Sequence, residues 1–583
     1  MHVPDAGRAA SLPPALESMT VPVQPTAPVD EQRFPRIRGE RHGAAHVISL
    51  VIALAVFLPI ATVLFVALSG SGEALPHLLR YVLPQSLGTT LLLLGLVASG
   101  TAITGVGAAW LVVGYDFPLR RLISWALVLP LAVPTYLSAY AFGEFFHYVG
   151  PLQTALRAVF GFESARDYWF PDIRSTWGAA LVVTSVTFPY VYLTARVVFL
   201  MQGRNIADVA RTLGARPARV FFRILLPVAR PAIIAGLALV MMETLNDIGA
   251  VEYLGVRTLT LSVYSTWLNR GSLEGAAQIA ALMLVIVFLL LTVEQWARRK
   301  QRFHNARGTQ MHARPPRTPL SGPKAWLATM ALLLPIASGF GVPLFVFGRY
   351  ASKRLYQFAD PQVFQALLTS ISVAGTTAIA AVIAALLLLN AVRVSRSAYT
   401  LVLVRLASIG YALPGTILGL GLLLSLAAID NAIDQAARDH AGFSTGLLLT
   451  GTAASIVIAC TIRFLALAES AIRSGMEKLP PSLDQAARSL GKTANQSALT
   501  ILLPLLRPAI LTAAILVFVD TVKELSATIL LRPFGFRSLA THVYENASRG
   551  AVEDGAVAAL LIIATAIVPV ILLSRPLMGD RHT

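Results

Sequence analysis

DVARTLGARPARVFFRILLPVARP, residues 208–231, recurs as QAARSLGKTANQSALTILLPLLRP at residues 485–508. The two windows are identical at ten positions and begin 277 residues apart. Each window is polar and basic in its middle and lies between long apolar segments. A loop that only joins two segments has no reason to recur with fixed spacing, so the repeat indicates duplication of a larger unit.

Outside these windows the chain is unusually apolar. It has 583 residues, of which 56% are hydrophobic and 13% are charged, whereas soluble proteins carry about 25% charged residues. The apolar residues form runs that reach the roughly 20 residues needed for a helix to cross a bilayer. The sequence therefore predicts an all-α, polytopic transmembrane protein. Its predicted spans are residues 46–69, 88–113, 122–143, 177–201, 230–251, 276–297, 325–348, 366–392, 399–427, 445–468, 507–531 and 552–574.

The net charge of +17 comes from arginines and lysines that cluster between the spans. Clusters precede span one and follow spans two, four, six, eight and twelve, as expected if all of them stay in the cytoplasm. We therefore expect both termini in the cytoplasm, and we attribute the charge to the membrane rather than to nucleic acid. One cluster, Arg349, Lys353 and Arg354, falls on the outer side of this topology.

The spans divide into two homologous halves of six, and an even number gives both halves the same, parallel orientation. We expect a disordered cytoplasmic tail at 1–44, a first transmembrane domain at 45–297 and a basic cytoplasmic linker at 298–323. A second transmembrane domain at 324–575 and a cytoplasmic tail at 576–583 complete the chain. Both copies of the repeated window then face the cytoplasm.

The first window predicts a helix–turn–helix on that cytoplasmic surface. Its first helical segment ends at Gly214, because glycine tolerates the positive φ that stops a helix. Pro227 interrupts a second, amphipathic segment, and Pro231 opens the next span.

This spacing resembles the cytoplasmic coupling loop of ABC-importer permeases: Glu-Ala-Ala, three residues, Gly, nine residues, then Ile-x-Leu-Pro. Asp208 and Gln485 replace the glutamate. In that family the loop docks on an ATPase subunit. The resemblance implies two copies of an ABC ATPase that bind ATP and Mg²⁺, and a chain with no catalytic residue and no cofactor of its own. The matching residues are Asp208, Ala210, Gly214, Ile224, Leu226 and Pro227, and Gln485, Ala486, Ala487, Gly491, Ile501, Leu503 and Pro504.

Stretches outside the loops are similar to ferric-iron ABC-importer permeases, among them METLNDIGAVEYLGV at 242–256 and VFVDTVKELSATILLRPFGFRSLATHVYE at 517–545. The resemblance implies the type I importer permease fold, the bacterial inner membrane, and ferric iron delivered by a periplasmic binding protein. The loop 144–175 is the longest predicted extracytoplasmic surface for that partner. Fused thiamine permeases share the architecture, so thiamine or another small solute is an alternative. An ion-coupled secondary transporter is a second alternative, because such proteins also combine repeated halves with buried carboxylates.

Gly491-Lys492-Thr493 has the ending of a phosphate-binding loop. A Walker A loop also needs a glycine five residues before, where this chain has Ala486. ATP binding by this chain is therefore not expected.

Four carboxylates lie inside the predicted spans five and eleven. Glu243 and Asp247 are four residues apart and would share one helix face, and Asp520 and Glu524 repeat this spacing. Carboxylates within a span usually face a bundle interior or water, and oxygen ligands suit a hard cation. We expect the four to line the translocation path, without a firmly assigned metal ligand. The structural alternative is that Asp520 pairs with Lys523, or that span eleven ends early and leaves Glu524 at the membrane interface.

Overall fold

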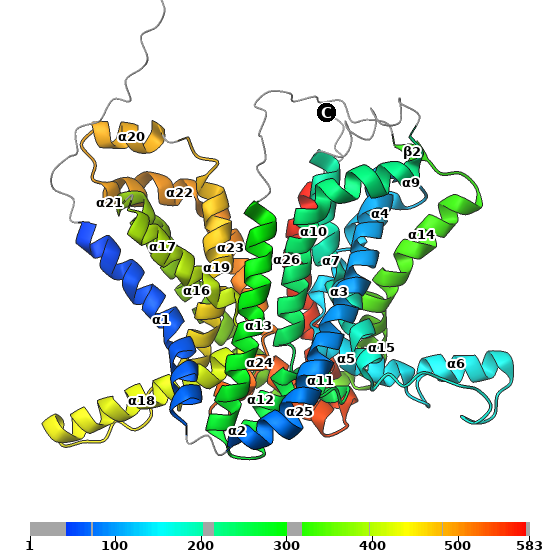
Figure 1. The fold of residues 1–583 in the computed structure, drawn as a ribbon, viewed down its shortest axis with the longest axis horizontal. Helices are drawn as coiled ribbons and strands as arrows, with labels where there is room; N and C mark the ends of the chain where they lie inside the picture. Colours follow the sequence, from blue (N-terminus) through cyan, green and yellow to red (C-terminus); the bar gives the residue numbers. More distant parts are fainter. Residues whose placement is uncertain are drawn as a thin grey trace, which may run out of the picture. The chain divides into compact units, whose positions relative to one another are not determined.

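The computed structural model describes residues 42–70, 74–201, 215–299, 317–395, 397–480 and 482–578. Residues 45–583 form one compact unit. The described residues are almost entirely helical (Figure 1), which confirms the all-α fold. Their only strands, β1 (Tyr115–Asp116) and β2 (Thr318–Pro319), pair in parallel over two residues each.

The helices of the first half are α1 (His42–Ser69), α2 (Ala74–His77), α3 (Leu83–Gly114), α4 (Arg120–Ala126), α5 (Thr135–Phe146), α6 (Pro151–Phe160), α7 (Thr176–Met201), α9 (Pro217–Val220), α10 (Leu226–Asn246), α11 (Gly249–Tyr253), α12 (Leu259–Leu268) and α13 (Leu273–Arg299). The second half contains α14 (Pro323–Ile336), α15 (Val342–Lys353), α16 (Pro361–Ser395), α17 (Ala398–Ala407), α18 (Gly415–Ala441), α19 (Ala454–Met476), α20 (Ser482–Ser489), α21 (Ala494–Ser497), α22 (Leu503–Leu505), α23 (Arg507–Val522), α24 (Ser526–Leu531), α25 (Leu539–Ser548) and α26 (Ala556–Met578). Short π-helical turns are η1 (Leu78–Val82), η3 (Phe221–Leu225), η4 (Ala337–Gly341) and η7 (Ala498–Leu502), and 3₁₀ turns are η2 (Leu129–Ala132), η5 (Leu355–Ala359), η6 (Ser408–Ala412) and η8 (Val552–Gly555).

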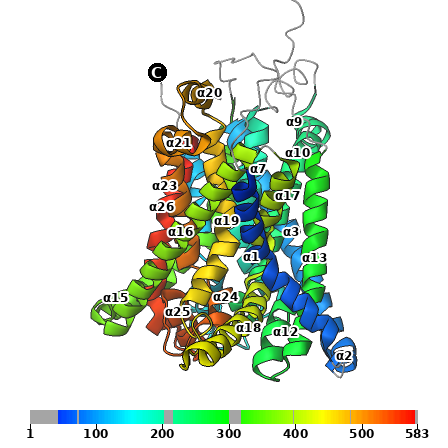
Figure 2. The same ribbon diagram turned by 90° about the vertical axis from the view of Figure 1, so that its left-hand side faces the viewer.

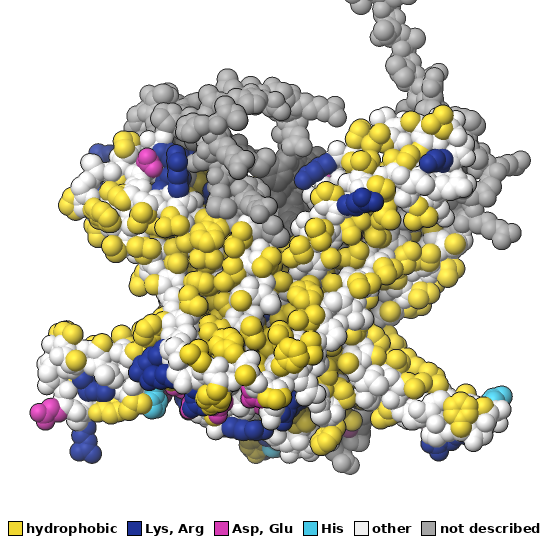
Figure 3. Space-filling model, turned by 180° about the vertical axis from the view of Figure 1, so that it is seen from behind, with side chains coloured by type: hydrophobic (Ala, Val, Ile, Leu, Met, Phe, Trp, Pro, Cys, Tyr) yellow, Lys and Arg dark blue, Asp and Glu magenta, His cyan; other side chains and the backbone are white. Residues whose placement is uncertain are grey.

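The described part of the chain has 10 helices long and apolar enough to cross a membrane, or 12 if each of two sharply bent helix pairs counts as one span. The larger number agrees with the predicted twelve. Hydrophobic side chains cover the middle of the molecule, while Lys and Arg gather toward its two ends (Figure 3). We call the end formed by α9, α20 and α21 the coupling end; α2, α12 and α25 lie at the opposite end (Figures 1 and 2).

The prediction of continuous helices is wrong for spans three and nine, because each breaks at a proline. Val133 and Leu413 are extended, with ψ of 116° and 124°, and α5 and α18 begin after Pro134 and Pro414. Proline has no amide hydrogen to donate and forces the preceding residue out of the helical region. The two breaks occupy equivalent places in the two halves.

Span ten also begins later than predicted, at Ala454 instead of residue 445. The carboxylate of Asp430 accepts hydrogen bonds from the backbone of Leu449 and Thr450 at 2.9–3.1 Å. These bonds satisfy the backbone amides outside a helix, so the segment returns as a hairpin along α18 before α19 starts.

Spans five and eleven end earlier than predicted, because an acidic residue caps the next short helix. Asp247 has φ −76° and ψ 110°, and its Oδ1 accepts the Ala250 amide at 2.9 Å to start α11. Glu524 accepts the Ala527 amide at 2.9 Å and starts α24. A side-chain oxygen that satisfies a free amide at a helix start favours a break at that point. Neither acidic pair therefore lies on one continuous helix face, contrary to the prediction.

Each half packs its first helix against the other half. In α1, Val56 belongs to the hydrophobic core formed mainly by α16, α18, α19 and α23. In α14, Ala328 joins the core of α3, α4 and α7, and the Thr329 hydroxyl donates to the Pro118 carbonyl at 3.1 Å. The two predicted domains are therefore interlocked, which explains why residues 45–583 form one unit.

The duplication extends to single hydrogen bonds. The Leu259 amide at the start of α12 donates to the Thr90 hydroxyl at 2.9 Å, and the Leu539 amide at the start of α25 donates to the Ser370 hydroxyl at 2.8 Å. Donor and acceptor are 169 residues apart in both cases. The two halves therefore share one backbone plan, and differences between them lie in their side chains.

Candidate functional site

The helix breaks of both halves converge on a cavity of about 80 Å³. A water molecule needs roughly 10–15 Å³ by the same measure, so the cavity has room for a few waters in this conformation. Its wall combines aromatic and aliphatic side chains with six charged ones, drawn from both halves. The lining residues are Leu131, Val133, Pro134, Thr135, Tyr136, Val186, Thr187, Tyr190, Glu243, Asn246, Asp247, Gly249, Tyr411, Arg463, Phe464, Asp520, Lys523, Glu524, Leu525 and Ser526.

All four predicted carboxylates lie in this wall. In the first half, Glu243 is half-buried on the last turn of α10, and Asp247 is buried in the break that follows. Asp247 Oδ1 accepts the amide that starts α11, whereas Asp247 Oδ2 has no hydrogen-bond partner among the described residues.

In the second half the same two positions carry ion pairs. Lys523 Nζ lies 2.8 Å from Asp520 Oδ1, so the pairing that we considered as the structural alternative is present. Glu524 lies 3.2 Å from Arg463 Nη1, and its other oxygen accepts the Thr528 amide and hydroxyl at 3.0 and 2.6 Å. Span eleven does end before Glu524, because α23 stops at Val522, and Glu524 is buried inside the protein.

Sequence reasoning missed Arg463 and Tyr136 in the cavity wall. Arg463 is a lone charge within the apolar helix α19, and a charge at such a depth is itself a signal of function or pairing. Tyr136 gave no signal, because only the break before α5 places this side chain against the cavity. Its Cβ would lie 2.7 Å from a methyl group built on Gly249, so it packs directly on the first turn of α11.

Backbone contacts tie the halves together beside the cavity. Asn246 Oδ1 accepts the Gly415 amide at 2.6 Å, and the Asn246 carbonyl accepts the Ser526 hydroxyl at 2.7 Å. Asn246 therefore joins the end of α10 to the starts of α18 and α24. Any relative movement of the halves at this level must break or rearrange both bonds.

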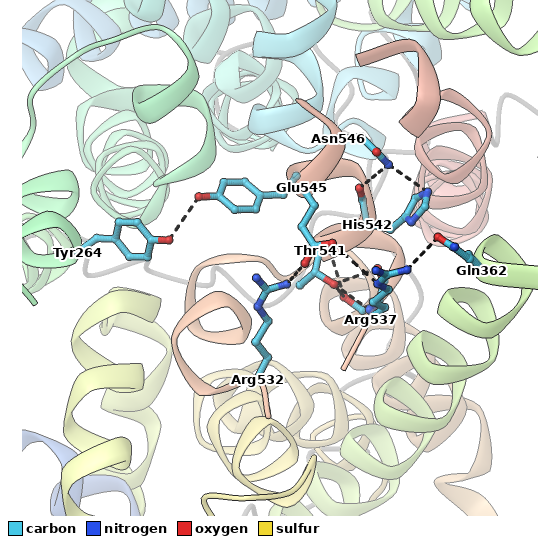
Figure 4. Close-up of polar contacts among 10 residues, drawn as sticks. Tyr264, Gln362, Arg532, Arg537, Thr541, His542, Glu545 and Asn546 are labelled. Atoms are coloured by element: carbon cyan, nitrogen blue, oxygen red, sulfur yellow. Dashed lines mark hydrogen bonds and ion pairs between the residues drawn. The ribbon is translucent and has the colours of Figure 1, made fainter. Parts of the chain in front are cut away.

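A second layer of contacts between the halves lies toward the opposite end, where α11 and α12 meet α25. The Tyr264 and Tyr544 hydroxyls are 3.5 Å apart, and Tyr544 donates to Glu252 at 2.8 Å. Within the second half, Arg532 and Glu545 form an ion pair that braces α25 against the end of α24 (Figure 4). These contacts join the two halves on the side of the cavity that faces the opposite end.

The second copy of the repeated window forms the predicted helix–turn–helix at the coupling end. Gln485, Ala486 and Ala487 lie in α20, and Gly491 follows with a φ of +85° in an exposed turn. A methyl group built on Gly491 would meet nothing within 4 Å, so the backbone angle and not lack of space requires glycine. The later motif residues lie in the next segment, Ile501 in η7 and Leu503 and Pro504 in α22.

Asp484, which sequence reasoning did not single out, holds this turn together. Its carboxylate accepts the Ser497 hydroxyl at 2.7 Å and pairs with Arg393 of α16 at 2.6 Å. Leu490 and Leu499 remain 85% and 66% exposed on the outer side. Rigid support from within and uncovered apolar side chains outside are features of a docking surface.

Three of the six motif residues of the first copy lie outside the described residues, namely Asp208, Ala210 and Gly214. Ile224 lies in η3, and Leu226 and Pro227 form the start of α10. The π-helical turns η3 and η7 interrupt both copies at the same motif position. The described residues contain no group of three or more His, Cys, Asp or Glu side chains placed to hold a metal ion.

Comparison with known proteins gives a consistent result. A family model described as "Binding-protein-dependent transport system inner membrane component" matches residues 101–302 and again residues 377–578. Over 529 residues, 90% of this chain and 97% of the relative, the chain is 24% identical to the Fe(3+)-transport system permease protein FbpB 2 of Haemophilus influenzae.

Other relatives match one half only. The chain is 30% identical over 207 residues to the molybdenum transport system permease protein ModB of Escherichia coli, covering 34% of this chain and 86% of the relative. It is 28% identical over 258 residues to the putative 2-aminoethylphosphonate transport system permease protein PhnU of Salmonella choleraesuis, covering 42% and 89%. The duplicated family match, the apolar helices and the interlocked halves together show that the chain belongs to the binding-protein-dependent transport inner-membrane components, as a fused, non-enzymatic, multi-pass permease.

Proposed function

We propose that this permease carries ferric iron across the bacterial inner membrane, in an ABC importer supplied by a periplasmic binding protein. The similarity to a ferric-iron permease along nearly the full length of both chains carries this proposal. The cavity supports it, because four carboxylates outnumber the two cationic side chains in its wall, which favours a cation over an anion. Oxygen ligands are also those that a hard cation such as Fe³⁺ prefers.

Two copies of an ABC ATPase would engage the two coupling loops, around Gly214 and Gly491. ATP and Mg²⁺ would be bound by those subunits, and this chain would bind no cofactor. Both termini would lie in the cytoplasm with the coupling end, in agreement with the charge distribution. ATP-driven closure of the ATPases would then rock the halves against each other and open the cavity to the two sides in turn.

The binding protein would dock at the opposite end, near the loop 144–175, whose helix α6 extends sideways from the bundle (Figure 1). This loop is braced internally: Tyr168 donates to Gln153 at 2.6 Å and Arg157 donates to the Tyr148 carbonyl at 2.9 Å. Two backbone amides, of Glu163 and Ser164, donate to Asp167 and hold the pKa of its carboxyl below the usual range. A braced loop presents a fixed surface, which lowers the entropy cost of docking.

Uptake of radiolabelled ferric iron by cells that depend on this chain tests the proposal. The comparison is wild type against the double variant Gly214→Asp, Gly491→Asp, with insertion of both confirmed in membranes. Iron uptake with wild type and its loss in the variant would support both the substrate and the coupling loops. Equal iron uptake with and without the chain would reject ferric iron, and thiamine uptake in the same cells would then test the main alternative. Uptake that persists after ATP depletion would favour an ion-coupled transporter.

A further inference from the structure

The duplicated halves contribute different charges to their shared cavity. We infer that Glu243, Asp247 and Tyr136 of the first half form the cation-contacting site, while Asp520 and Glu524 of the second half position the wall. This inference rests on the proposed transport of ferric iron and names the side chains that meet the cargo.

The second-half acids are already neutralised. Lys523 lies 2.8 Å from Asp520, and Arg463 lies 3.2 Å from Glu524 with only 9% and 2% of the two side chains exposed. Glu524 also accepts three hydrogen bonds from the start of α24. A carboxylate with its charge paired and its lone pairs occupied has little capacity left for a passing cation.

The first-half acids lack such partners. No ion pair involves Glu243 or Asp247 among the described residues, and Asp247 Oδ2 has no hydrogen-bond partner there. The Tyr136 hydroxyl is likewise unpartnered. Asp247 and Tyr136 are 6% and 4% exposed, and both line the cavity. Buried polar groups almost always have partners, so these two oxygens are free to contact a molecule in the cavity, either water or cargo. Arg463 Nε in the same wall is also without a partner among the described residues.

The two halves share one backbone arrangement, so the difference in charge pairing between them arises from their side chains. Pro134 and Pro414 begin equivalent helices, so the position of Tyr136 corresponds to Thr416, which does not line the cavity. Tyr136 therefore has no equivalent at its own position, although Tyr411 brings a phenol to the wall from elsewhere in the second half. The first half supplies two carboxylates without ion pairs and the phenols of Tyr136 and Tyr190, and the second half supplies two ion pairs and one phenol.

Two carboxylates and a phenol suit a trivalent iron in transit. All three are hard oxygen donors. Binding would form an Fe–O bond to Tyr136 while the phenol proton passes to water in the cavity. Such a site is incomplete as a closed metal centre and leaves coordination positions for water, which keeps affinity low enough for release.

Absorption spectroscopy of the purified full-length chain tests the site without transport. Titration with ferric nitrilotriacetate should produce the visible charge-transfer band of an iron–phenolate bond. Tyr136→Phe should abolish the band, and Asp247→Asn should weaken binding at least about tenfold, the loss seen when groups that support metal ligands are removed. Tyr192→Phe and Asp430→Asn are matched controls in buried positions away from the cavity and should bind as wild type does.

A second comparison tests the asymmetry itself. The double variant Arg463→Met, Glu524→Gln removes an ion pair without changing the net charge of the cavity, so it should weaken iron binding less than Asp247→Asn does. Absence of the band in wild type, or equal loss in this variant and in Asp247→Asn, would overturn the inference. If wild type takes up iron and Asp247→Asn takes it up equally well, the inferred site is wrong and the proposed function still stands. A Tyr136-dependent band without iron uptake would uphold the site and reject the proposed function.

Discussion

The buried pair between Arg463 and Glu524 offers the sharpest test of the structure. Arg463→Met keeps an unbranched side chain of similar length and removes the positive charge. Glu524 then remains as a buried carboxylate, with 2% of its side chain exposed and no cationic partner. We expect this single change to destabilise the chain although it removes no apolar contact.

The expected magnitude follows from the geometry. Breaking a buried ion pair by removing one partner costs about 3–5 kcal/mol. The three hydrogen bonds from α24 remain and stabilise the lone carboxylate, so the lower part of this range, about 3 kcal/mol, is expected. Glu524→Gln alone leaves Arg463 unpaired and turns an amide donor toward the backbone donors of α24. The double variant should recover about 1–3 kcal/mol relative to the sum of the single losses, as expected for coupled contacts.

The stabilities of the four detergent-purified chains are compared by thermal unfolding. Size-exclusion chromatography after heating then gives the amount of folded protein that remains. We expect wild type to be most stable, and the double variant to lose less stability than the two single losses added together. Single variants whose losses simply add in the double variant would show that the two side chains do not interact, and the positioning role of Glu524 would be refuted.

Three further predictions concern the turn at Gly491, the interlocked helices, and the layer of contacts around Tyr264, Tyr544 and Glu252. Gly491→Val should reduce ATP-driven uptake severalfold with normal insertion, while Gly491→Asn should not, because asparagine tolerates a positive φ that costs other residues about 1–2 kcal/mol; equal effects would refute a conformational role. Gly339→Leu should lower the melting temperature, because its Cβ would lie 2.0 Å from the Ser185 carbonyl oxygen. Gly107→Ala, with nothing within 4 Å, should leave the melting temperature unchanged. Similar midpoints for the two variants would argue against the interlocked packing of the halves. Tyr544→Phe should raise ATP hydrolysis without binding protein by roughly fivefold, the effect of losing a bond worth about 1 kcal/mol; unchanged hydrolysis would mean that the layer is not a gate.

The features that sequence predicts well here are those set by local chemistry. Apolar runs of sufficient length gave the spans, and the glycine spacing in the repeat predicted the turn at Gly491, which has the positive φ that glycine allows. The repeat also predicted one backbone plan for both halves, and the paired bonds from Leu259 and Leu539 bear this out.

The features that sequence missed depend on contacts between distant segments. Arg463 and its partner Glu524 are 61 residues apart, and no local pattern links them. The packing of α1 against the second half and of α14 against the first half depends on which apolar face fits which half. Hydropathy carries no such information. Asp247 shows a local competition instead: helical periodicity predicted a shared face with Glu243, but the demand for a cap at α11 prevailed.

One basic cluster departs from the rule that arginine and lysine stay on the cytoplasmic side, and this departure also depends on contacts between distant segments. Arg354 lies in a cluster predicted on the outer side of the membrane, yet it pairs with Glu553 at 3.3 Å and with Asp554, next to the start of α26. The rule counts basic residues near the ends of spans and takes no account of their partners. A paired arginine can therefore stay outside, where its charge stabilises a contact between two helices of the second half.

Duplication and divergence act on different parts of this molecule for a physical reason. In the proposed importer, two docking loops would present the same shape to two ATPases, and the loop motifs and helix breaks keep their spacing in both halves. A single cargo would pass through the shared cavity, and nothing requires the two sides of that cavity to be alike. Asn246, the last residue of α10, and Lys523, which directly follows α23, occupy equivalent positions, yet one bridges the halves through neutral hydrogen bonds and the other neutralises Asp520. In the proposed mechanism, such charge differences would leave the backbones of the two halves symmetric during rocking, while the cargo would contact mainly the first-half side of the cavity.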